Sequence, residues 1–187
     1  MGRTMIAETM IAETPRLVLR RFTPADLDAL AVLFSDPEVM RFSPGVRNRP
    51  ATRLWLEAAI ASYAENGWGH WAAVGRDDGR FVGFCGLKAW EVEGRREVEI
   101  GYRLATACWG RGLATEAATA ARDAGFGRYG LERLVSLIEA ANVASWRVAE
   151  KVGMRYERDV GMLGKRLRLY AIGRGNPPCP PFSKGGP

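Results

Sequence analysis

The sequence predicts an α/β (α+β mixed) fold built as a single domain. Its centre is one mixed β-sheet of about six to seven strands, with helices on both faces. Two observations predict this fold. Segments with apolar residues at every second position are interleaved with segments of helical periodicity, in the order β-α-α-β-β-β-α-β-α-β-β. The 187 residues, 47% of them hydrophobic, suit one domain with a sizeable core.

The first third of the chain predicts one strand followed by two helices. Residues 16–22 alternate between apolar and polar and form the strand. Thr23 can cap the first helix, because its hydroxyl accepts from free backbone N–H groups, and Pro24 fits the first helical position. Pro37 ends that helix, and a second helix covers residues 50–65.

The remainder of the chain predicts six strands and two further helices. One helix begins at Gly112 and is rich in alanine, which allows close packing on a sheet. The other opens at Asn142 and is closed by Gly153 in the usual position after a helix. The six strands are residues 68–74, 80–87, 96–104, 133–138, 155–159 and 165–172.

The two ends of the chain fall outside this pattern. Residues 4–13 hold a short direct repeat, which we interpret as a duplicated start region, and we expect residues 1–12 to be a loosely ordered extension. Residues 173–187 are rich in proline and glycine and predict a disordered tail. The folded domain is therefore expected to cover residues 14–172.

The net charge of +6 comes from 27 basic and 21 acidic residues. Such an excess suits an anionic ligand and also attracts nucleic acid weakly. The basic residues are scattered, and the sequence has neither a recognition helix nor a dense basic stripe. We therefore expect no dedicated nucleic-acid binding.

Cysteine and histidine are scarce. Three cysteines without a C-x-x-C pair argue against a disulfide framework and for a reducing compartment. The single histidine, His70, argues against a structural zinc site, and we expect no metal. No apolar run is long enough to span a membrane, and Glu8 and Glu13 interrupt the N-terminal apolar residues. We expect a cytoplasmic protein without membrane association.

The strongest motif is a glycine-bearing turn between a predicted strand and a predicted helix, at residues 109–117, Trp-Gly-Arg-Gly-Leu-Ala-Thr-Glu-Ala. The first N–H groups of a helix have no partner within the helix, and the macrodipole places partial positive charge there. Gly110 and Gly112 carry no Cβ, so a phosphate can approach the backbone closely. The stretch therefore predicts an anion site. The complete dinucleotide fingerprint is absent, since Thr115 stands where its third glycine belongs.

Four segments together resemble the GNAT superfamily of acetyl-coenzyme A dependent N-acetyltransferases. They are Glu-Ile-Gly-Tyr-Arg-Leu at 99–104, the glycine stretch at 109–117, Asn-Val-Ala-Ser at 142–145 and Glu-Lys-Val-Gly-Met at 150–154. Two further segments, Thr-Pro-Arg-Leu-Val-Leu-Arg at 14–20 and Ser-Asp-Pro-Glu-Val-Met-Arg at 35–41, are similar to the branch that contains the RimJ and RimL ribosomal-protein-alanine acetyltransferases. The resemblance implies a single GNAT-like N-acetyltransferase domain over residues 14–172.

The resemblance also implies where acetyl-coenzyme A, as co-substrate, is bound. The end of the strand at Arg103 and Leu104 would pair with the pantetheine amides, and Asn142 would hydrogen-bond the pantetheine arm. The pyrophosphate would lie on successive backbone N–H groups, those of Gly110, Arg111, Gly112, Leu113, Ala114 and Thr115.

Two residues are candidates for catalysis. Glu99 lies on the strand that leads to the glycine loop and could accept the proton of the attacking amine; alternatively it faces solvent or pairs with an arginine. The family's usual tyrosine acid is replaced by Ala149. By resemblance, Ser145 would instead donate a hydrogen bond to the departing sulfur, and its alternative role is to cap the helix. We interpret His70 as structural.

The leading hypothesis is acetyl transfer to a primary amine, specifically the N-terminal α-amine of a protein or peptide. One alternative is a small-molecule amine such as a polyamine or an aminoglycoside. Another is a non-catalytic acyl-coenzyme A binding module with a regulatory role. The sequence determines neither the acceptor nor whether the protein is a monomer or a homodimer.

Overall fold

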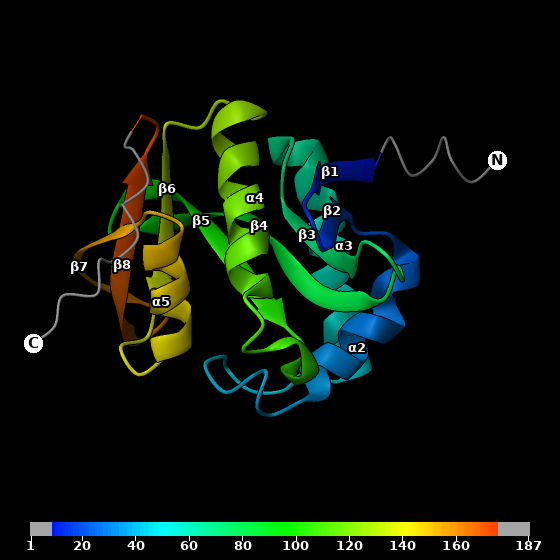
Figure 1. The fold of residues 1–187 in the computed structure, drawn as a ribbon. Coiled ribbons are helices and arrows are strands. Elements are labelled where there is room, and N and C mark those ends of the chain that lie inside the picture. Colours follow the sequence, from blue (N-terminus) through cyan, green and yellow to red (C-terminus); the bar gives the residue numbers. More distant parts are fainter. Residues whose placement is uncertain (1–8, 176–187) are drawn as a thin grey trace, which may run out of the picture.

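The computed structural model describes residues 9–175, which form one eight-stranded sheet with the strand order β1-β2-β3-β4-β5-β6-β8-β7 (Figure 1). Within these residues β5 and β6 pair in parallel and all other neighbours pair antiparallel, so the mixed sheet is confirmed. The strands are β1 Met10–Glu13, β2 Leu17–Arg21, β3 His70–Gly75, β4 Phe81–Val92, β5 Arg95–Leu104, β6 Arg133–Ile138, β7 Arg155–Met162 and β8 Lys165–Gly173.

Helices cover both faces of the sheet, as predicted (Figure 1). On β4, Cys85 and Leu87 point into a core that includes the alanine stripe of α4, whereas Phe84 points into a second core with α2 and α3. The helices are α2 Leu27–Ser35, α3 Arg49–Asn66, α4 Leu113–Gly127 and α5 Val143–Lys151, with short 3-10 turns η1 Pro24–Asp26 and η2 Thr106–Cys108.

The strand count exceeds the prediction by one because β1 was not foreseen. We expected residues 1–12 to be loosely ordered, yet residues 10–12 pair with β2, Met10 lying opposite Arg20 and Ala12 opposite Leu19. Ile11 and Ala12 are half-buried against the main core. This burial explains why the strand forms from apolar residues that we attributed to a duplicated start. Residues 1–8 lie outside the described residues.

The predicted Pro/Gly-rich tail falls mostly outside the structure, because residues 176–187 are not among the described residues. The last strand, β8, runs to Gly173, and Arg174 then forms an ion pair with Glu132. No helix within residues 9–175 is long and apolar enough to cross a membrane.

A gap opens in the middle of the sheet, between β5 and β6. The only register pair that joins these two strands in the described structure is Glu99 opposite Val135. Ser136 then donates from its hydroxyl to the carbonyl of Ile100 at 3.1 Å. Beyond this point β5 and β6 share no further pair along residues 101–104, so both strands present free edges to a common space.

Candidate active site

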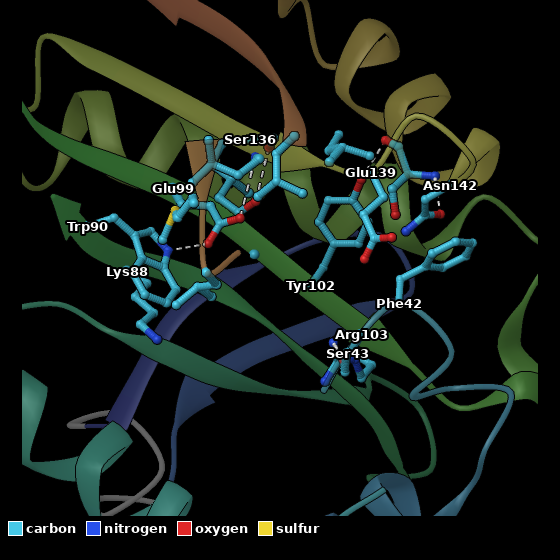
Figure 2. A pocket seen from close by; sticks show the side chains of 18 of the residues that line it. Phe42, Ser43, Lys88, Trp90, Glu99, Tyr102, Arg103, Ser136, Glu139 and Asn142 are labelled. Carbon is cyan, nitrogen blue, oxygen red and sulfur yellow. Dashed lines mark hydrogen bonds between the residues drawn. The ribbon is translucent and has the colours of Figure 1, made fainter. Parts of the chain in front are cut away.

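The gap between β5 and β6 leads into a cavity of about 340 Å³ (Figure 2). Its walls come from β3, β4, β5, β6, the loop between α2 and α3, the start of α3, the first turn of α5 and the β7–β8 hairpin. Four residues singled out from the sequence line it together: Glu99, Arg103, Asn142 and Ser145. The chain segments that carry them are far apart in sequence, and the fold brings them to one place.

The register of the sheet determines which side chains form the cavity floor. Lys88 of β4 lies directly opposite Glu99 of β5, and Phe84 lies opposite Arg103. All four therefore project from the same face, toward α2 and α3. A Cβ at Gly101, between Glu99 and Arg103, would lie 2.9 Å from the His70 Nε2 atom. Glycine at this position thus leaves room for the imidazole.

Glu99 is partly buried and forms no ion pair within residues 9–175. Its Oε2 accepts a hydrogen bond from the indole N–H of Trp90 at 2.6 Å, and its Oε1 accepts a long one from the Leu137 N–H at 3.4 Å (Figure 2). Burial raises the pKa of this carboxyl, although these donors and the charges of Lys88 and Arg103 oppose the rise. Neither of the alternatives for Glu99, free exposure or an arginine partner, describes this environment.

His70 has the environment of a structural histidine. Its ring is stacked on Trp55 at 5.4 Å between centroids and meets Phe84 edge-on at 5.0 Å. Burial, with the charges of Lys88 and Arg103, lowers the pKa of His70 to about 3. The imidazole is therefore neutral at physiological pH. It lines the cavity as an aromatic wall.

The free edge of β5 is formed by alternate residues. Ala105 donates its N–H to the Val82 carbonyl, so hydrogen bonds toward β4 fall on the odd-numbered residues of this stretch. Tyr102 and Leu104 accordingly direct their backbone groups toward β6. The Leu104 carbonyl is already occupied by the indole N–H of Trp109 at 2.8 Å. The backbone of Tyr102 is thus the most available for a ligand, whereas Arg103 turns its backbone to β4.

The Arg103 side chain is directed away from the gap and toward the loop between α2 and α3. Its guanidinium donates to the Ser43 hydroxyl at 2.5 Å and lies 3.2 Å from the Met40 sulfur. Burial and the charge of Arg47 lower the pKa of Arg103 to about 10. Arg103 therefore remains a cation at neutral pH, with neutral partners only.

The glycine loop has the geometry of an anion cradle. Gly110 and Gly112 adopt φ angles of +70° and +77°, a conformation that favours glycine, and α4 begins directly afterwards at Leu113. No N–H group from Gly110 to Thr115 donates a hydrogen bond to another described residue. Six consecutive donors at a helix N-terminus fit a pyrophosphate. The residues at 110–115 thus match the group that the sequence implies there.

A clamp connects this loop to the start of β2. The Glu116 carboxylate accepts from the Thr14 hydroxyl at 2.7 Å, from the Arg16 N–H at 2.9 Å and from the Arg16 Nε at 2.7 Å. Arg16 also donates to the Arg111 carbonyl at 2.9 Å. We call Thr14, Arg16 and Glu116 the loop clamp. These partners hold the pKa of Glu116 below its usual range despite partial burial.

The first turn of α5 faces the gap from the other side. Asn142 caps the helix, its Oδ1 accepting from the Ser145 N–H at 3.3 Å, so the capping role belongs to Asn142 and not to Ser145. The Tyr102 hydroxyl donates to the Ser145 carbonyl at 2.7 Å. Neither the Ser145 hydroxyl nor the side-chain NH₂ of Asn142 donates a hydrogen bond to any described residue.

Several cavity residues escaped prediction because only the strand register brings them together. Lys88 and Trp90 belong to a strand with no recognisable motif, and Arg47 belongs to a loop. The sequence does hold one clue. Once the hairpin turn between β4 and β5 is placed at Gly94, the pairing of the two strands puts Lys88 opposite Glu99.

Comparison with known proteins identifies the family. The family described as Acetyltransferase (GNAT) domain matches residues 16–155. The chain belongs to this family. The protein YkkB of Bacillus subtilis is 35% identical over 167 residues, which cover 89% of this chain and 96% of YkkB. The uncharacterized N-acetyltransferase YoaA of the same organism is 32% identical, covering 89% of this chain and 91% of its own. This GNAT protein is therefore an acetyltransferase.

Solved structures share the same fold. RimL, a ribosomal-protein α-N-acetyltransferase solved in complex with coenzyme A, superposes with a TM-score of 0.73 at 20% identity, covering 88% of this chain and 97% of that chain. An aminoglycoside acetyltransferase, AAC(6')-Ib with coenzyme A, superposes at 0.70 with 15% identity, covering 84% and 95%. At these identities the likeness concerns the fold and leaves the acceptor open.

Proposed function

We propose that this GNAT acetyltransferase transfers the acetyl group of acetyl-coenzyme A to the N-terminal α-amine of a protein or peptide. One observation carries the proposal. Glu99, a carboxylate without an ion pair among the described residues, lies at the gap between β5 and β6, beside the free edge that runs toward the glycine loop. The proposed proton acceptor would thus lie in the same cavity as the proposed binding path for coenzyme A.

Acetyl-coenzyme A would be held mainly by the backbone. The free N–H groups from Gly110 to Thr115 would bind its pyrophosphate, and the backbone of Tyr102 would pair with the pantetheine amides. The Asn142 amide would complete the track from the α5 side. When bound, acetyl-coenzyme A supplies an acetyl group activated as a thioester.

Glu99 would accept the proton of the attacking amine, directly or through one water molecule. The amine nitrogen forms a bond to the acetyl carbon, the carbon–sulfur bond breaks, and the proton passes by way of Glu99 to solvent. An α-amine, with a pKa of about 7.7–8.0, is far easier to deprotonate than a lysine, with a pKa of about 10.4. The raised pKa of Glu99 suits such a weak acid–base role.

Ser145 would assist the departing sulfur. Its hydroxyl has no partner within residues 9–175 and lines the same cavity as Glu99. A thiol has a pKa of about 8.5, so its thiolate leaves readily and one hydrogen bond is sufficient help. Glu99 would thus act on the attacking amine and Ser145 on the leaving sulfur.

Purified protein incubated with acetyl-coenzyme A and a library of free-N-terminal peptides tests the proposal, with thiol release and peptide mass as readouts. We expect peptides to gain one acetyl group on the α-amine. The same peptides with a blocked N-terminus and a free lysine are the control. Acetylation of polyamines or aminoglycosides alone would support the small-amine alternative. Tight coenzyme A binding without turnover of any amine would support a binding module.

A further inference from the structure

Three cationic side chains face the cavity on the side of α2 and α3. They are Arg47 of the loop before α3, Lys88 of β4 and Arg103 of β5. None of them forms an ion pair within the described part of the chain, although ten other basic side chains do. We call these three residues the cationic wall.

The partners of the cationic wall are neutral. The Lys88 ammonium lies 3.6 Å from the centroid of the Trp90 ring. Arg103 is bonded to a hydroxyl and a thioether, and the buried Arg47 Nε has no hydrogen-bond partner among residues 9–175. A buried guanidinium nitrogen without an acceptor is costly, because it has lost water and gained nothing in exchange.

The negative charge in the cavity does not balance the cationic wall. Two carboxylates line the cavity, and Glu139 is paired with Lys165. Glu99 alone faces the wall. Burial lowers the pKa of Lys88 and of Arg103, and the charge of Arg47 lowers both further, whereas Glu99 raises both. The three cations therefore repel one another, and a further anion in the cavity would relieve that repulsion.

The phosphates of coenzyme A do not account for the cationic wall. Their predicted cradle is at the N-terminus of α4, which covers the opposite face of the sheet. The wall instead projects toward α2 and α3, beside Phe42 and Trp55. In Figure 2, Arg103 and Ser43 lie apart from Asn142, below Tyr102 and Phe42 in the view. The wall and Glu99 line the same cavity and project from the same face of the sheet, so an acceptor in that cavity would contact both.

We infer that the acceptor is a peptide N-terminus that carries a carboxylate side chain, Asp or Glu, among its first residues. The inference rests on the proposed function and adds the acceptor class. The α-amine would lie at Glu99 while the acidic side chain contacts the cationic wall. The same charges disfavour polyamines and aminoglycosides, since like charges in a partly buried site repel strongly.

Peptides of equal length that differ only at residues two and three, as Asp, Ala or Lys, test the inference. We expect kcat/KM to be about 10-fold higher for the Asp peptides than for the Ala peptides, and lowest for the Lys peptides. Lys88→Met keeps the aliphatic stem and removes the charge, and should reduce the Asp-to-Ala ratio to about 3-fold or less through KM for the peptide. The dissociation constant for acetyl-coenzyme A should stay unchanged.

Arg53→Met is the matched control, because Arg53 is an exposed residue of α3 outside the cavity and the substitution removes the same charge. It should keep the full Asp-to-Ala ratio. Equal or better use of Ala or Lys peptides by the wild type overturns the inference and leaves the proposed function intact. A weakening of acetyl-coenzyme A binding by Lys88→Met also overturns it, by assigning the wall to the co-substrate. No turnover of any amine would instead remove the proposed function itself.

Free aspartate and its amide are the last acceptors to be compared with the peptides. Both carry an α-amine, and a small acid would satisfy the wall without a peptide. Preference for the peptides supports the inference as stated. Preference for free aspartate overturns the peptide assignment and retains only the need for a carboxylate.

Discussion

The two sides of the gap between β5 and β6 differ in their polar groups: one side uses the backbone and the other uses side chains. On the α4 side, the polar groups are backbone N–H groups of six consecutive residues, 110–115, and the backbone of Tyr102. On the α2–α3 side, they are side chains from three separate segments, among them Arg47 and Lys88. The first side depends on local conformation. The second depends on which side chains the fold happens to bring together, so it can change its ligand without changing the fold.

This difference leads to opposite responses to mutation. The backbone side should tolerate changes of side chain and fail when the backbone conformation changes. The side-chain side should keep its shape and lose its chemistry when a single functional group is altered. Glu99 projects on the α2–α3 side, at the gap itself, and its substitution should have the largest effect of all.

Glu99→Gln keeps the size of the side chain and removes the proton acceptor. We expect kcat/KM to fall by about 100-fold or more, the usual contribution of a positioned general base. Because the pKa of Glu99 is raised, wild-type activity should decline at low pH as the carboxyl takes up its proton, and this decline should be absent from the variant. The protonation of the amine itself, at about pH 7.7–8.0, affects both proteins.

The matched control is Glu97→Gln, two residues earlier on the same strand. Glu97 is 3% exposed and forms an ion pair with Arg133, outside the cavity. The Glu97→Gln substitution should lower the free energy of unfolding and change kcat by less than about 3-fold. Steady-state kinetics across pH check both variants. Equal losses in the two would mean that Glu99 acts through the stability of β5.

The backbone side could be predicted from the sequence because its determinants are neighbours in the chain. A strand, two glycines and a helix start occupy residues 98–117, and the positive φ angles of Gly110 and Gly112 agree with the prediction. The order of the elements could also be predicted, since strand and helix periodicities are local. Among the described strands only β1 escaped, because its residues fall in the direct repeat that we interpreted as a duplicated start region.

The cationic wall could not be predicted, since its members are 41 and 15 residues apart and share no motif. Placing Lys88 opposite Glu99 requires the register of a hairpin, and a shift of one residue would turn Lys88 to the other face. The same is true of Trp90, whose bond to Glu99 spans nine residues. Local patterns predict elements, whereas side-chain clusters depend on the pairing between elements.

Gly112→Ala tests the backbone side. The φ angle of +77° costs a residue with a Cβ about 1–2 kcal/mol, so the loop would shift and misdirect its N–H groups. We expect the dissociation constant for acetyl-coenzyme A to rise by about 10-fold, with kcat at saturation changed much less. Calorimetric titration measures the constant.

Gly130→Ala is the control for Gly112→Ala. Gly130 has a similar φ of +64° and nothing within 4 Å of an added Cβ, and it lies beyond the far end of α4. Its stability loss should match that of Gly112→Ala, while its affinity for acetyl-coenzyme A stays that of the wild type. An unchanged affinity in Gly112→Ala would mean that the cradle tolerates a different loop conformation.

The smallest expected effect concerns the loop clamp, the one place where the backbone side depends on distant side chains. Glu116→Gln removes the charge that binds Arg16 and should lower the free energy of unfolding by about 1 kcal/mol at pH 7, since Arg16 is half-exposed. Affinity for acetyl-coenzyme A should fall by about 3-fold, because the loop loses its anchor on β2. The lowered pKa of Glu116 fixes the sign of the pH dependence. Its contribution is complete above the ordinary carboxyl pKa of about 4.3 and disappears as pH falls through the lowered value, so wild type and variant should converge in acid.

Glu13→Gln separates the loop clamp from an ordinary surface pair. Glu13 binds Arg76, with both side chains more than two-fifths exposed, and such pairs contribute about 0–1 kcal/mol. Denaturant unfolding at neutral and acidic pH compares the two variants, and titration with acetyl-coenzyme A gives their affinities. If both lose equally little stability and neither loses affinity, the loop holds its conformation unaided. The backbone side would then be independent of distant side chains altogether, and the contrast between the two sides of the gap would be complete.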